Sequence, residues 1–389
     1  MNKYFDKVPN RINTNSVKWD ALSIYFNKSN LYPMWVADMD FKSPPEIKEA
    51  LIKRASHNVY GYSMPLDSYY LSVIKWHKNR HNSNINKEWI VITPGIVFAI
   101  NAIIQTFSQK NDAILVQKPV YYPFFNSIKT NQRKVINNPL KYKNNLYSID
   151  FNDFEQKIYN NKVKLFILSN PHNPVGRVWT EEELTEIVRI CKKYNVLIIS
   201  DEIHQDIVYS GYKHIPLTNI SDYKNIIICS SPSKTFNLAG LQISNIIIPD
   251  SKLREQLKNT LNKIGFHNPN LFGIIATETA YNNCSYWVDE LIKYLENNRN
   301  YINSFFKNNF PKIELPPIEA TFLAWLNFKK LNIPPDKIHS TLIEKGLLAL
   351  DKGTWFGKKE GQYFERLNFA CPNKNLKKAL NTIKNIFSE

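Results

Sequence analysis

The sequence is poor in cysteine and has no long apolar run. Its 389 residues include four cysteines, which lie far apart and form no Cys-x-x-Cys pair: Cys191, Cys229, Cys284 and Cys371. This scarcity predicts a reducing compartment and no structural zinc site. No apolar run reaches the roughly 18 residues of a membrane span, and the N-terminus lacks the apolar core of a signal peptide. We therefore expect a soluble, cytoplasmic protein with no membrane partner.

Two motifs that mark common α/β enzymes are also absent. There is no Gly-x-Gly-x-x-Gly, which disfavours dinucleotide binding, and no Gly-x-Ser-x-Gly nucleophile elbow. His77 and His81 have a spacing that could bind a metal, but their neighbours Lys78 and Arg80 are basic and no carboxylate lies nearby in sequence. We interpret this stretch as the solvated end of a basic helix and expect no metal site.

The chain is short of acidic residues relative to basic ones. It has 50 Lys and Arg against 34 Asp and Glu, a formal net charge of +16. The lysines are spread along the whole chain, and no recognition helix, zinc finger or aromatic–basic RNA motif accompanies them. We interpret the charge as a solvated basic surface and expect no nucleic-acid partner.

Four apolar runs in the middle of the chain have the length of strands and show no polar alternation. This pattern is typical of strands covered on both faces in a largely parallel sheet. Between the second and third run, Thr180 and Glu183 form a capping box that opens a helix with an apolar stripe. The order predicts an α/β fold with a mostly parallel sheet sandwiched by helices. The four runs are 112–117, 164–170, 196–202 and 225–230.

The last hundred residues have a different pattern, which predicts a smaller α+β domain that also includes the N-terminal arm. The predicted elements are a long helix over about 285–310, a strand over 320–328 and a helix near 336–345. The predicted division is an arm and part of the small domain over 1–50, a large domain over 51–284 and a small C-terminal domain over 285–389.

A lysine follows the fourth apolar run, among small and hydroxylic residues. Lys234 stands close to Ser231 and Ser233 at the end of a predicted strand. Partial desolvation lowers the pKa of a lysine towards the amine that attacks carbonyls, and the hydroxyls could hold a phosphate. Pyridoxal 5′-phosphate (PLP) requires this combination. Serine β-lactamases also use a nearby Ser and Lys, so the neighbouring motifs must decide.

Two other strand ends supply an amide and a carboxylate. Asn170 is the last residue of the run 164–170, and Asp201 is the last but one of the run 196–202. Because the carboxyl ends of parallel strands meet at one edge of a sheet, we expect both near Lys234. In a PLP site the carboxylate would keep the pyridine nitrogen protonated and the amide would donate to the ring 3-oxygen. The alternative for Asp201, a surface helix cap, is disfavoured by the four apolar residues before it.

Two further stretches fit a phosphorylated, planar cofactor. Gly95 and Ile96 begin a predicted helix that continues to Phe107, and free N–H groups at a helix start can bind phosphate. Tyr121 follows another strand and could stack on a ring. In isolation these are an ordinary turn-to-helix junction and an ordinary packing aromatic.

Three motifs occur in order along the chain: Asn-Pro-His-Asn-Pro-x-Gly-Arg from Asn170, Ser-Asp-Glu-Ile-His from Ser200, and Ser-Pro-Ser-Lys-Thr-Phe-Asn-Leu-Ala-Gly-Leu from Ser231. Together they resemble the fold type I PLP enzymes and, within them, the cystathionine β-lyase-like C–S lyases of the MalY/PatB type. Segments 14–20, 33–41, 60–62 and 366–372 resemble the same subfamily.

The resemblance implies PLP as cofactor and a role for each candidate residue. Lys234 would bond to the cofactor aldehyde, Asp201 would face the pyridinium and Asn170 the 3-oxygen. The other cofactor contacts would be Tyr121 on the ring, His204 three residues after Asp201, and Ser231, Ser233, Gly95 and Ile96 at the phosphate. His204 and Gln242 depart from the tyrosine and arginine common in aminotransferases, which leaves the phosphate without an evident cation.

The substrate contacts are also implied by the resemblance. Arg366 would bind the α-carboxylate as a bidentate fork, and the backbone at Val36 and Ala37 would close over the substrate. Tyr62 would reach into the neighbouring active site of a homodimer.

The activity implied is α,β-elimination of L-cystathionine or a related cysteine S-conjugate to a thiol, pyruvate and ammonia. Cystine, cysteine and larger S-conjugates fit the resemblance equally. One alternative is an aminotransferase that acts on an L-amino acid and a 2-oxo acid. An alternative of another class is a PLP-binding regulatory protein that acts through a protein partner.

Overall fold

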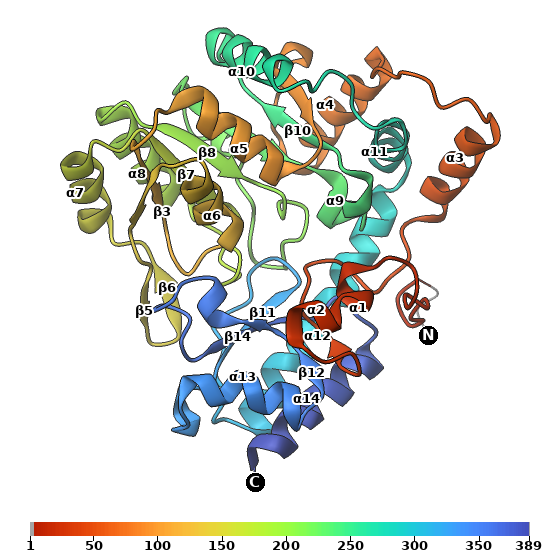
Figure 1. The fold of residues 1–389 in the computed structure, drawn as a ribbon, viewed down its shortest axis with the longest axis vertical. Coiled ribbons are helices and arrows are strands. Elements are labelled where there is room, and N and C mark those ends of the chain that lie inside the picture. The colour runs from red at the N-terminus through yellow and green to blue at the C-terminus, as the bar shows by residue number, and fades with distance from the viewer. Residues whose placement is uncertain (1–3, 389) are drawn as a thin grey trace.

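The computed structural model describes residues 4–388, and a seven-stranded sheet organises the upper part of the molecule in Figure 1. Its strand order is β2-β10-β9-β8-β7-β3-β4. Neighbours from β9 to β4 are parallel, whereas β10 runs antiparallel to both β2 and β9. The largely parallel sheet predicted from the sequence is confirmed. The strands are β2 (Ile90–Thr93), β3 (Ala113–Val116), β4 (Lys134–Asn137), β7 (Leu165–Ser169), β8 (Leu197–Asp201), β9 (Ile226–Ser230) and β10 (Ser244–Ile247).

Continuous apolarity of the central strands has a direct structural reason. In β7, Leu165 and Ile167 pack into one hydrophobic core, while Phe166 and Leu168 pack into the core on the opposite face. Since successive side chains of a strand point to opposite faces, a strand between two cores must be apolar at every position. The four predicted strands coincide with β3, β7, β8 and β9.

Helices cover both faces of this sheet. One core is closed by α5 (Ile96–Phe107), α6 (Tyr122–Thr130) and α10 (Ser251–Lys263), and Figure 1 shows α5 and α6 in front of the strands. The opposite core is closed by α4 (Asp67–His81), α7 (Phe151–Asn161), α8 (Glu181–Lys193) and α11 (Leu271–Asn283). The predicted capping box at Thr180 opens α8, with both of its reciprocal hydrogen bonds present.

Smaller sheets and long helices form the lower part. An antiparallel sheet has the order β11-β14-β13, and β1 pairs in parallel with β12. The predicted late helices and strand coincide with α12, β11 and α13. The elements are β1 (Tyr32–Pro33), β11 (Leu323–Asn327), β12 (Leu348–Ala349), β13 (Asp351–Lys352), β14 (Phe364–Asn368), α12 (Ser285–Asn309), α13 (Pro335–Glu344) and α14 (Asn373–Ser388).

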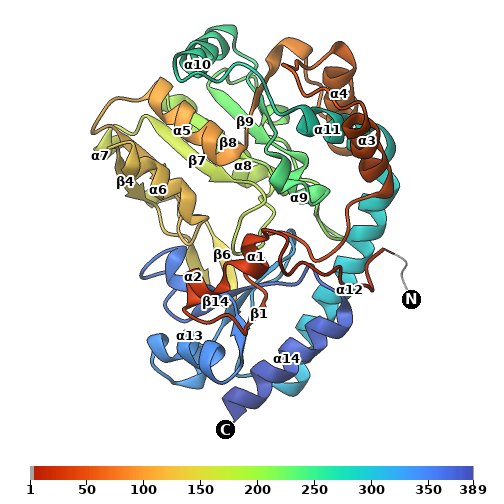
Figure 2. The same cartoon turned by 45° about the vertical axis from the view of Figure 1, so that its right-hand side comes forward.

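The N-terminal arm joins the two parts. Figure 2 shows α1 (Val17–Asp20) and α2 (Leu22–Phe26) between the large sheet and the lower elements, and the chain then continues to α3 (Pro45–Ser56). A hairpin of β5 (Lys141–Lys143) and β6 (Leu146–Ser148) reaches down from the large sheet, and α9 (Pro232–Thr235) follows β9 directly. The arm is thereby brought close to the carboxyl ends of the central strands.

All four cysteines are free and buried. Among the helices within residues 4–388, none combines the length and the apolar character that crossing a membrane would take.

Candidate active site

A cavity opens at the carboxyl ends of β7, β8 and β9, the edge at which parallel sheets commonly bind ligands. Ser169, Asp201 and Ser231 line it from these three strand ends. The cavity therefore gathers residues that are distant in sequence. Its other lining residues are Ala37, Pro94, Gly95, Ile96, Val97, Tyr121, Asn173, Ile203, His204, Ser233, Lys234, Ala239, Gln242 and Ile243.

Lys234 lies on α9, so its position is set by the central strand before it. The Ser231 hydroxyl caps this helix by accepting from Ser233 N at 3.1 Å. Lys234 Nζ donates to the carbonyl of Ala37 over 2.6 Å. Burial lowers the pKa of Lys234 to about 8, although the charge of Asp38 opposes the change. About half of this amine is therefore neutral at pH 8, as a nucleophile or a base requires.

Asp201 is the last residue of β8, and it lines the same cavity as Lys234. Its buried carboxylate accepts a hydrogen bond from Ile203 N at 3.2 Å. Burial raises the pKa of Asp201 to about 7, because this N–H and the charge of Lys234 compensate only part of the lost hydration. A buried carboxylate with so little compensation is suited to a cationic ligand atom.

The N-terminus of α5 forms an anion-binding end of the cavity. Gly95 and Ile96 supply backbone N–H groups there, and Gly95 has a φ of +125°, a conformation that favours glycine. The Ser231 hydroxyl is already committed, since it donates to the carbonyl of Ile243 at 2.8 Å. Lys234 is the only cation among the described residues that line the cavity, and the residue at position 242 of this lining is an uncharged glutamine. Dipoles, not a second cation, would hold an anion here.

Tyr121 places a fixed aromatic ring on the cavity wall. Its ring packs edge-on to Phe124, with centroids 5.7 Å apart, and its backbone N donates to Asn173 O at 3.1 Å. Burial raises the pKa of Tyr121, so the phenol stays protonated.

Arg366 lies on β14, outside the cavity lining, and hydrogen-bonds to Asn173, which lines the cavity. Its Nη1 donates to Asn173 Oδ1 at 3.0 Å, and its Nη2 pairs with Asp351. The guanidinium carbon lies 4.7 Å from the ring centroid of Phe356, and Nε has no hydrogen-bond partner among residues 4–388. The bidentate fork expected for a substrate carboxylate is therefore partly occupied by Asp351.

The expectation for Asn170 is wrong, and Asn173 takes its place at the cavity. The Asn170 side chain is buried outside the cavity lining, and its Nδ2 donates to Ile215 O at 3.2 Å. Asn173 lines the cavity, and its Oδ1 is engaged by Arg366, which leaves Nδ2 to face a ligand. The first polar residue after a strand is the natural candidate in a sequence, but the turn after β7 aims the next asparagine of the motif inward.

Two other expected residues lie outside this cavity. Tyr62 is fully exposed in the coil between α3 and α4. Val36 lines a neighbouring cavity together with Ala37, which lines both.

His204 is buried and lines the cavity, as expected. Its Nδ1 has no hydrogen-bond partner in the described part of the chain, and burial lowers its pKa well below the ordinary value. The ring packs edge-on to Phe322, with centroids 5.9 Å apart. His204 is therefore a neutral imidazole that packs beside the ligand space.

A family model described as "Aminotransferase class I and II" matches residues 33–383. The chain belongs to this family. The cystathionine β-lyase PatB of Bacillus subtilis is 40% identical over 382 residues, which cover 98% of each chain. A PLP-bound structure from Clostridium difficile, provisionally named an aminotransferase, has a TM-score of 0.96 and 42% identity over 98% of this chain and 99% of that one. Cystalysin from Treponema denticola, which contains PLP, has a TM-score of 0.95 and 35% identity over 99% and 98%.

The cavity residues of this aminotransferase-family chain fit PLP. Asp201 is a buried carboxylate that lacks a full cationic partner, as a pyridinium nitrogen would provide. The α5 N-terminus suits a phosphate, the amine of Lys234, whose pKa is lowered, suits an aldehyde, and Tyr121 offers a ring face. The four features share one cavity.

The interpretation of His77 and His81 as a solvated helix end is wrong. Both are buried, and His81 Nε2 lies 2.7 Å from Asp206 Oδ1. The same carboxylate accepts from Thr235, the residue after Lys234, at 2.6 Å. The carboxylate that the local sequence lacked comes from the loop after β8, 125 residues away.

Proposed function

We propose that the protein is a PLP-dependent C–S β-lyase, which cleaves L-cystathionine or related cysteine S-conjugates with water to a thiol, pyruvate and ammonia. One observation carries the proposal: Lys234 and Asp201 are both buried and line the same cavity. The N-terminus of α5, which can bind an anion, lines this cavity too. The relatives named cystathionine β-lyase and cystalysin support the substrate class.

The cofactor contacts follow from the cavity. Asp201 would hold the pyridinium, Asn173 Nδ2 the ring 3-oxygen and Tyr121 one ring face. Gly95 and Ile96 would donate N–H groups to the phosphate, assisted by Ser233. When bound, PLP withdraws electrons from the substrate Cα.

Lys234 has two successive tasks in this proposal. Its amine would hold the cofactor through the aldehyde until the substrate amine takes its place. The freed amine removes the proton from Cα, which the low pKa of Lys234 favours near neutral pH. The Cβ–S bond then breaks, and the thiolate takes the electron pair of that bond.

Arg366 and the 35–41 backbone would position the substrate. Arg366 carries its charge beside Asn173, close enough to the cavity to attract an α-carboxylate, and Nε is an unused donor. The carboxylate would share the guanidinium with Asp351.

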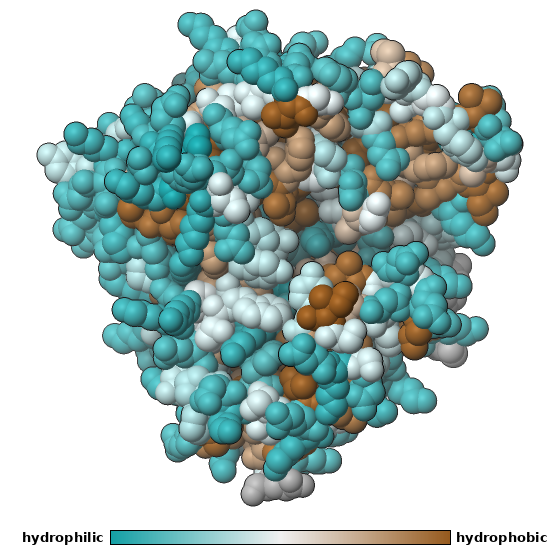
Figure 3. All heavy atoms as spheres, in the orientation of Figure 1, coloured by the Kyte–Doolittle hydropathy of each residue, from teal (hydrophilic) through white to brown (hydrophobic). Residues whose placement is uncertain are grey.

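We further propose a homodimer in which Tyr62 enters the partner's active site. The coil after α3 exposes a row of apolar side chains, and Figure 3 shows apolar surface over this region at the upper right. Such a patch favours association. The exposed residues are Val59, Tyr60, Tyr62, Met64 and Leu66. The division into 1–50, 51–284 and 285–389 remains our proposal for the domains.

Mixing two inactive variants tests the shared site. Lys234→Ala and Tyr62→Ala each damage a different half of the site, so a hybrid dimer would contain one intact site. Random reassembly should recover about a quarter of the wild-type pyruvate rate, since half of the dimers are hybrids with one of two sites intact. No recovery from two variants that are each inactive and dimeric would contradict the shared site.

An aminotransferase is the second candidate, because the family model and the Clostridium difficile neighbour carry that name. Incubation of the PLP-loaded protein with L-cystathionine, without any 2-oxo acid, separates the two. Steady pyruvate release that is lost in Lys234→Ala supports the lyase. Conversion of the cofactor to its pyridoxamine form without pyruvate would support the aminotransferase instead.

A further inference from the structure

A second cavity meets Lys234 from the side of the N-terminal arm. Ala37, Lys234 and Ala239 line both cavities, so the amine lies in the partition between them. The second cavity is also lined by Arg11, Ser16 and Asp38. Residues of the N-terminal arm are thus close to Lys234, although they lie outside the sequence motifs that follow β7, β8 and β9.

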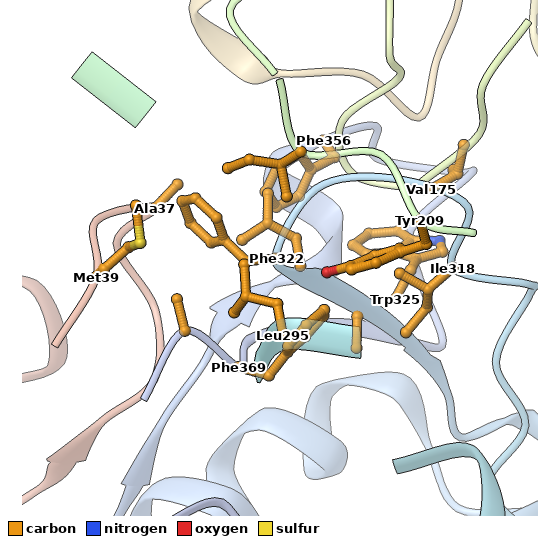
Figure 4. Close-up of a cluster of buried hydrophobic side chains, with 14 of the residues drawn as sticks. Ala37, Met39, Val175, Tyr209, Leu295, Ile318, Phe322, Trp325, Phe356 and Phe369 are labelled. Carbon is orange, nitrogen blue, oxygen red and sulfur yellow. The ribbon is translucent and has the colours of Figure 1, made fainter. Parts of the chain in front are cut away.

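The wall that carries Ala37 is the 35–41 segment, which belongs to no helix or strand. Five consecutive carbonyls of this segment each accept a hydrogen bond from a side chain. Figure 4 shows Ala37 and Met39 beside the hydrophobic cluster that includes Phe322, on which the segment rests. The donors to the carbonyls of residues 35 to 39 are, in order, Arg366, Asn368, Lys234, Asn368 with Lys18, and Asn237 with Arg11.

Arg11 holds the residue directly after Ala37. Its Nη1 and Nη2 donate to the two carboxylate oxygens of Asp38 at 2.9 and 2.6 Å, in a bidentate fork. Nη1 also reaches Asp40 Oδ1 at 2.8 Å and the carbonyl of Met39 at 3.1 Å. One guanidinium therefore fixes three residues of the 35–41 segment.

Lys18 completes this cluster from the same arm. Its Nζ donates to Asp40 Oδ2 at 2.9 Å, and both side chains are 1% exposed. Trp19 Nε1 donates to the other oxygen of Asp40 at 3.0 Å. Two cations thus balance two carboxylates, and the cluster adds no net charge beside Lys234.

We propose that Arg11 and Lys18 are positioning residues, which hold the Ala37 carbonyl over Lys234 and cancel the charge of Asp38 and Asp40 at the reactive amine. The inference rests on the proposed function only in that Lys234 binds PLP. The other charged or titratable groups that face Lys234 are Asp201 and His204 near the end of β8 and Arg366 on β14.

Two variants of the PLP-loaded protein should shift the pH midpoint of the bound cofactor's absorbance in opposite directions. Arg11→Ala leaves two carboxylates with one cation, so the pH midpoint of the bound cofactor's visible absorbance change should rise by about one pH unit. Asp38→Asn removes a negative charge that favours the protonated lysine, so the same midpoint should fall. Structural damage alone would not give shifts of opposite sign.

Arg189→Ala is the matched control, since Arg189 also makes a two-bond pair with one carboxylate, Glu186, but on the exposed face of α8. It should leave the midpoint unchanged. Arg11→Lys should restore the positive charge but not the bidentate pair with Asp38. The pH midpoint should therefore return to the wild-type value, while kcat for pyruvate release stays several-fold low.

The outcomes separate this inference from the proposed function. A wild-type protein without PLP absorbance would contradict the function. Normal PLP binding with unshifted midpoints in both Arg11→Ala and Asp38→Asn, or shifts of the same sign, would overturn the positioning role alone. If Arg11→Ala fails to fold, two measurements still test the positioning role. They are the fall in the pH midpoint expected for Asp38→Asn and the reduced kcat expected for Arg11→Lys.

Discussion

The two walls of the active-site cavity are held in place by different bonds. The sheet wall, formed by Asp201, Ser231 and Lys234, stands at the ends of β8 and β9, whose backbones are paired to strands on both sides. The opposite wall, the 35–41 segment, has no such ladder, and side chains from three separate regions, the N-terminal arm, α9 and β14, hold its carbonyls.

This difference predicts how each wall responds to substitution. A strand end keeps its place when one side chain changes, because the backbone ladder is unaffected. A segment held by side chains loses geometry and buried hydrogen bonds with a single change. Sheet-wall variants should therefore lose chemistry at little cost in stability, whereas variants of the 35–41 segment should lose both.

Asp201→Asn should have the largest effect on activity. The amide keeps the shape but cannot hold a cationic nitrogen by charge, and kcat for pyruvate release should fall by about 10² to 10⁴-fold. The melting temperature should stay the same or rise, because burial raises the pKa of Asp201 and the ionised form is costly in the folded protein. Parallel kinetics and thermal unfolding check both.

The neighbouring carboxylate provides the control. Glu202 is buried but fully partnered by Ser200, Leu217 N and His214. Glu202→Gln should reverse the pattern, with a loss of about 2 kcal/mol of stability and a nearly normal rate per folded enzyme. Equal stability losses in the two variants would contradict the description of the sheet wall.

Asn368→Ala should be the most damaging change for the 35–41 segment. Its Nδ2 donates to the carbonyls of Val36 and Asp38, both at 2.6 Å. The loss of these two part-buried hydrogen bonds should cost about 1 to 3 kcal/mol, because Asp38 N and Lys18 Nζ still donate to the same carbonyls. KM should rise because the substrate loses its cover. Urea unfolding and steady-state kinetics measure the two effects.

Asn298→Ala is the matched variant elsewhere in the molecule. Asn298 also donates to two carbonyls, those of Phe369 and Cys371, at 3.1 and 2.9 Å. It should lose similar stability without a comparable rise in KM. If both variants raise KM alike, the 35–41 segment has no special relation to the substrate.

The same contrast explains what the sequence could predict. β7, β8 and β9 were predictable because a strand buried on both faces has a continuous run of apolar residues in its sequence. Asp201 and Lys234 follow these strands directly, so their shared cavity was predictable from the geometry of parallel strand ends.

The 35–41 segment and its partners were not predictable in this way. Ala37 meets Lys234 across 197 residues, and His81 meets Asp206 across 125, with no pattern in either local sequence to announce the contact. The choice of Asn173 over Asn170 depends on the path of one turn. The periodicity of a sequence indicates which face of a helix or strand is buried. It does not indicate which distant residue packs against that face.

Behind the sheet wall, Asp206 should make stability depend on acid pH. Burial alone would raise the pKa of Asp206, but hydrogen bonds from His81 and Thr235 outweigh it and lower the pKa to about 2. Because the folded-state pKa lies below the unfolded value, the stabilisation is complete above about pH 4 and is lost as pH falls towards 2.

The variant Asp206→Asn isolates this contribution. Urea unfolding of wild type and variant should show a stability difference that is constant from pH 7 to 5 and shrinks by about 2 kcal/mol between pH 4 and 2. A difference that stays constant down to pH 2 would show that the carboxylate is not specifically stabilised in its ionised form.

Thr180→Ala should give the smallest effect and tests whether the sheet wall depends on its crossover helix. Thr180 Oγ1 accepts from Glu183 N at 3.2 Å at the start of α8, which connects β7 to β8. Losing this cap should cost about 1 kcal/mol, and Thr180→Ser should restore it. The pyruvate rate should not change, because the ladder of β7, β8 and β9 holds Asp201 and Lys234 independently of the cap. A fall in kcat that Thr180→Ser reverses would show that α8, and not the ladder alone, sets the geometry of the strand ends.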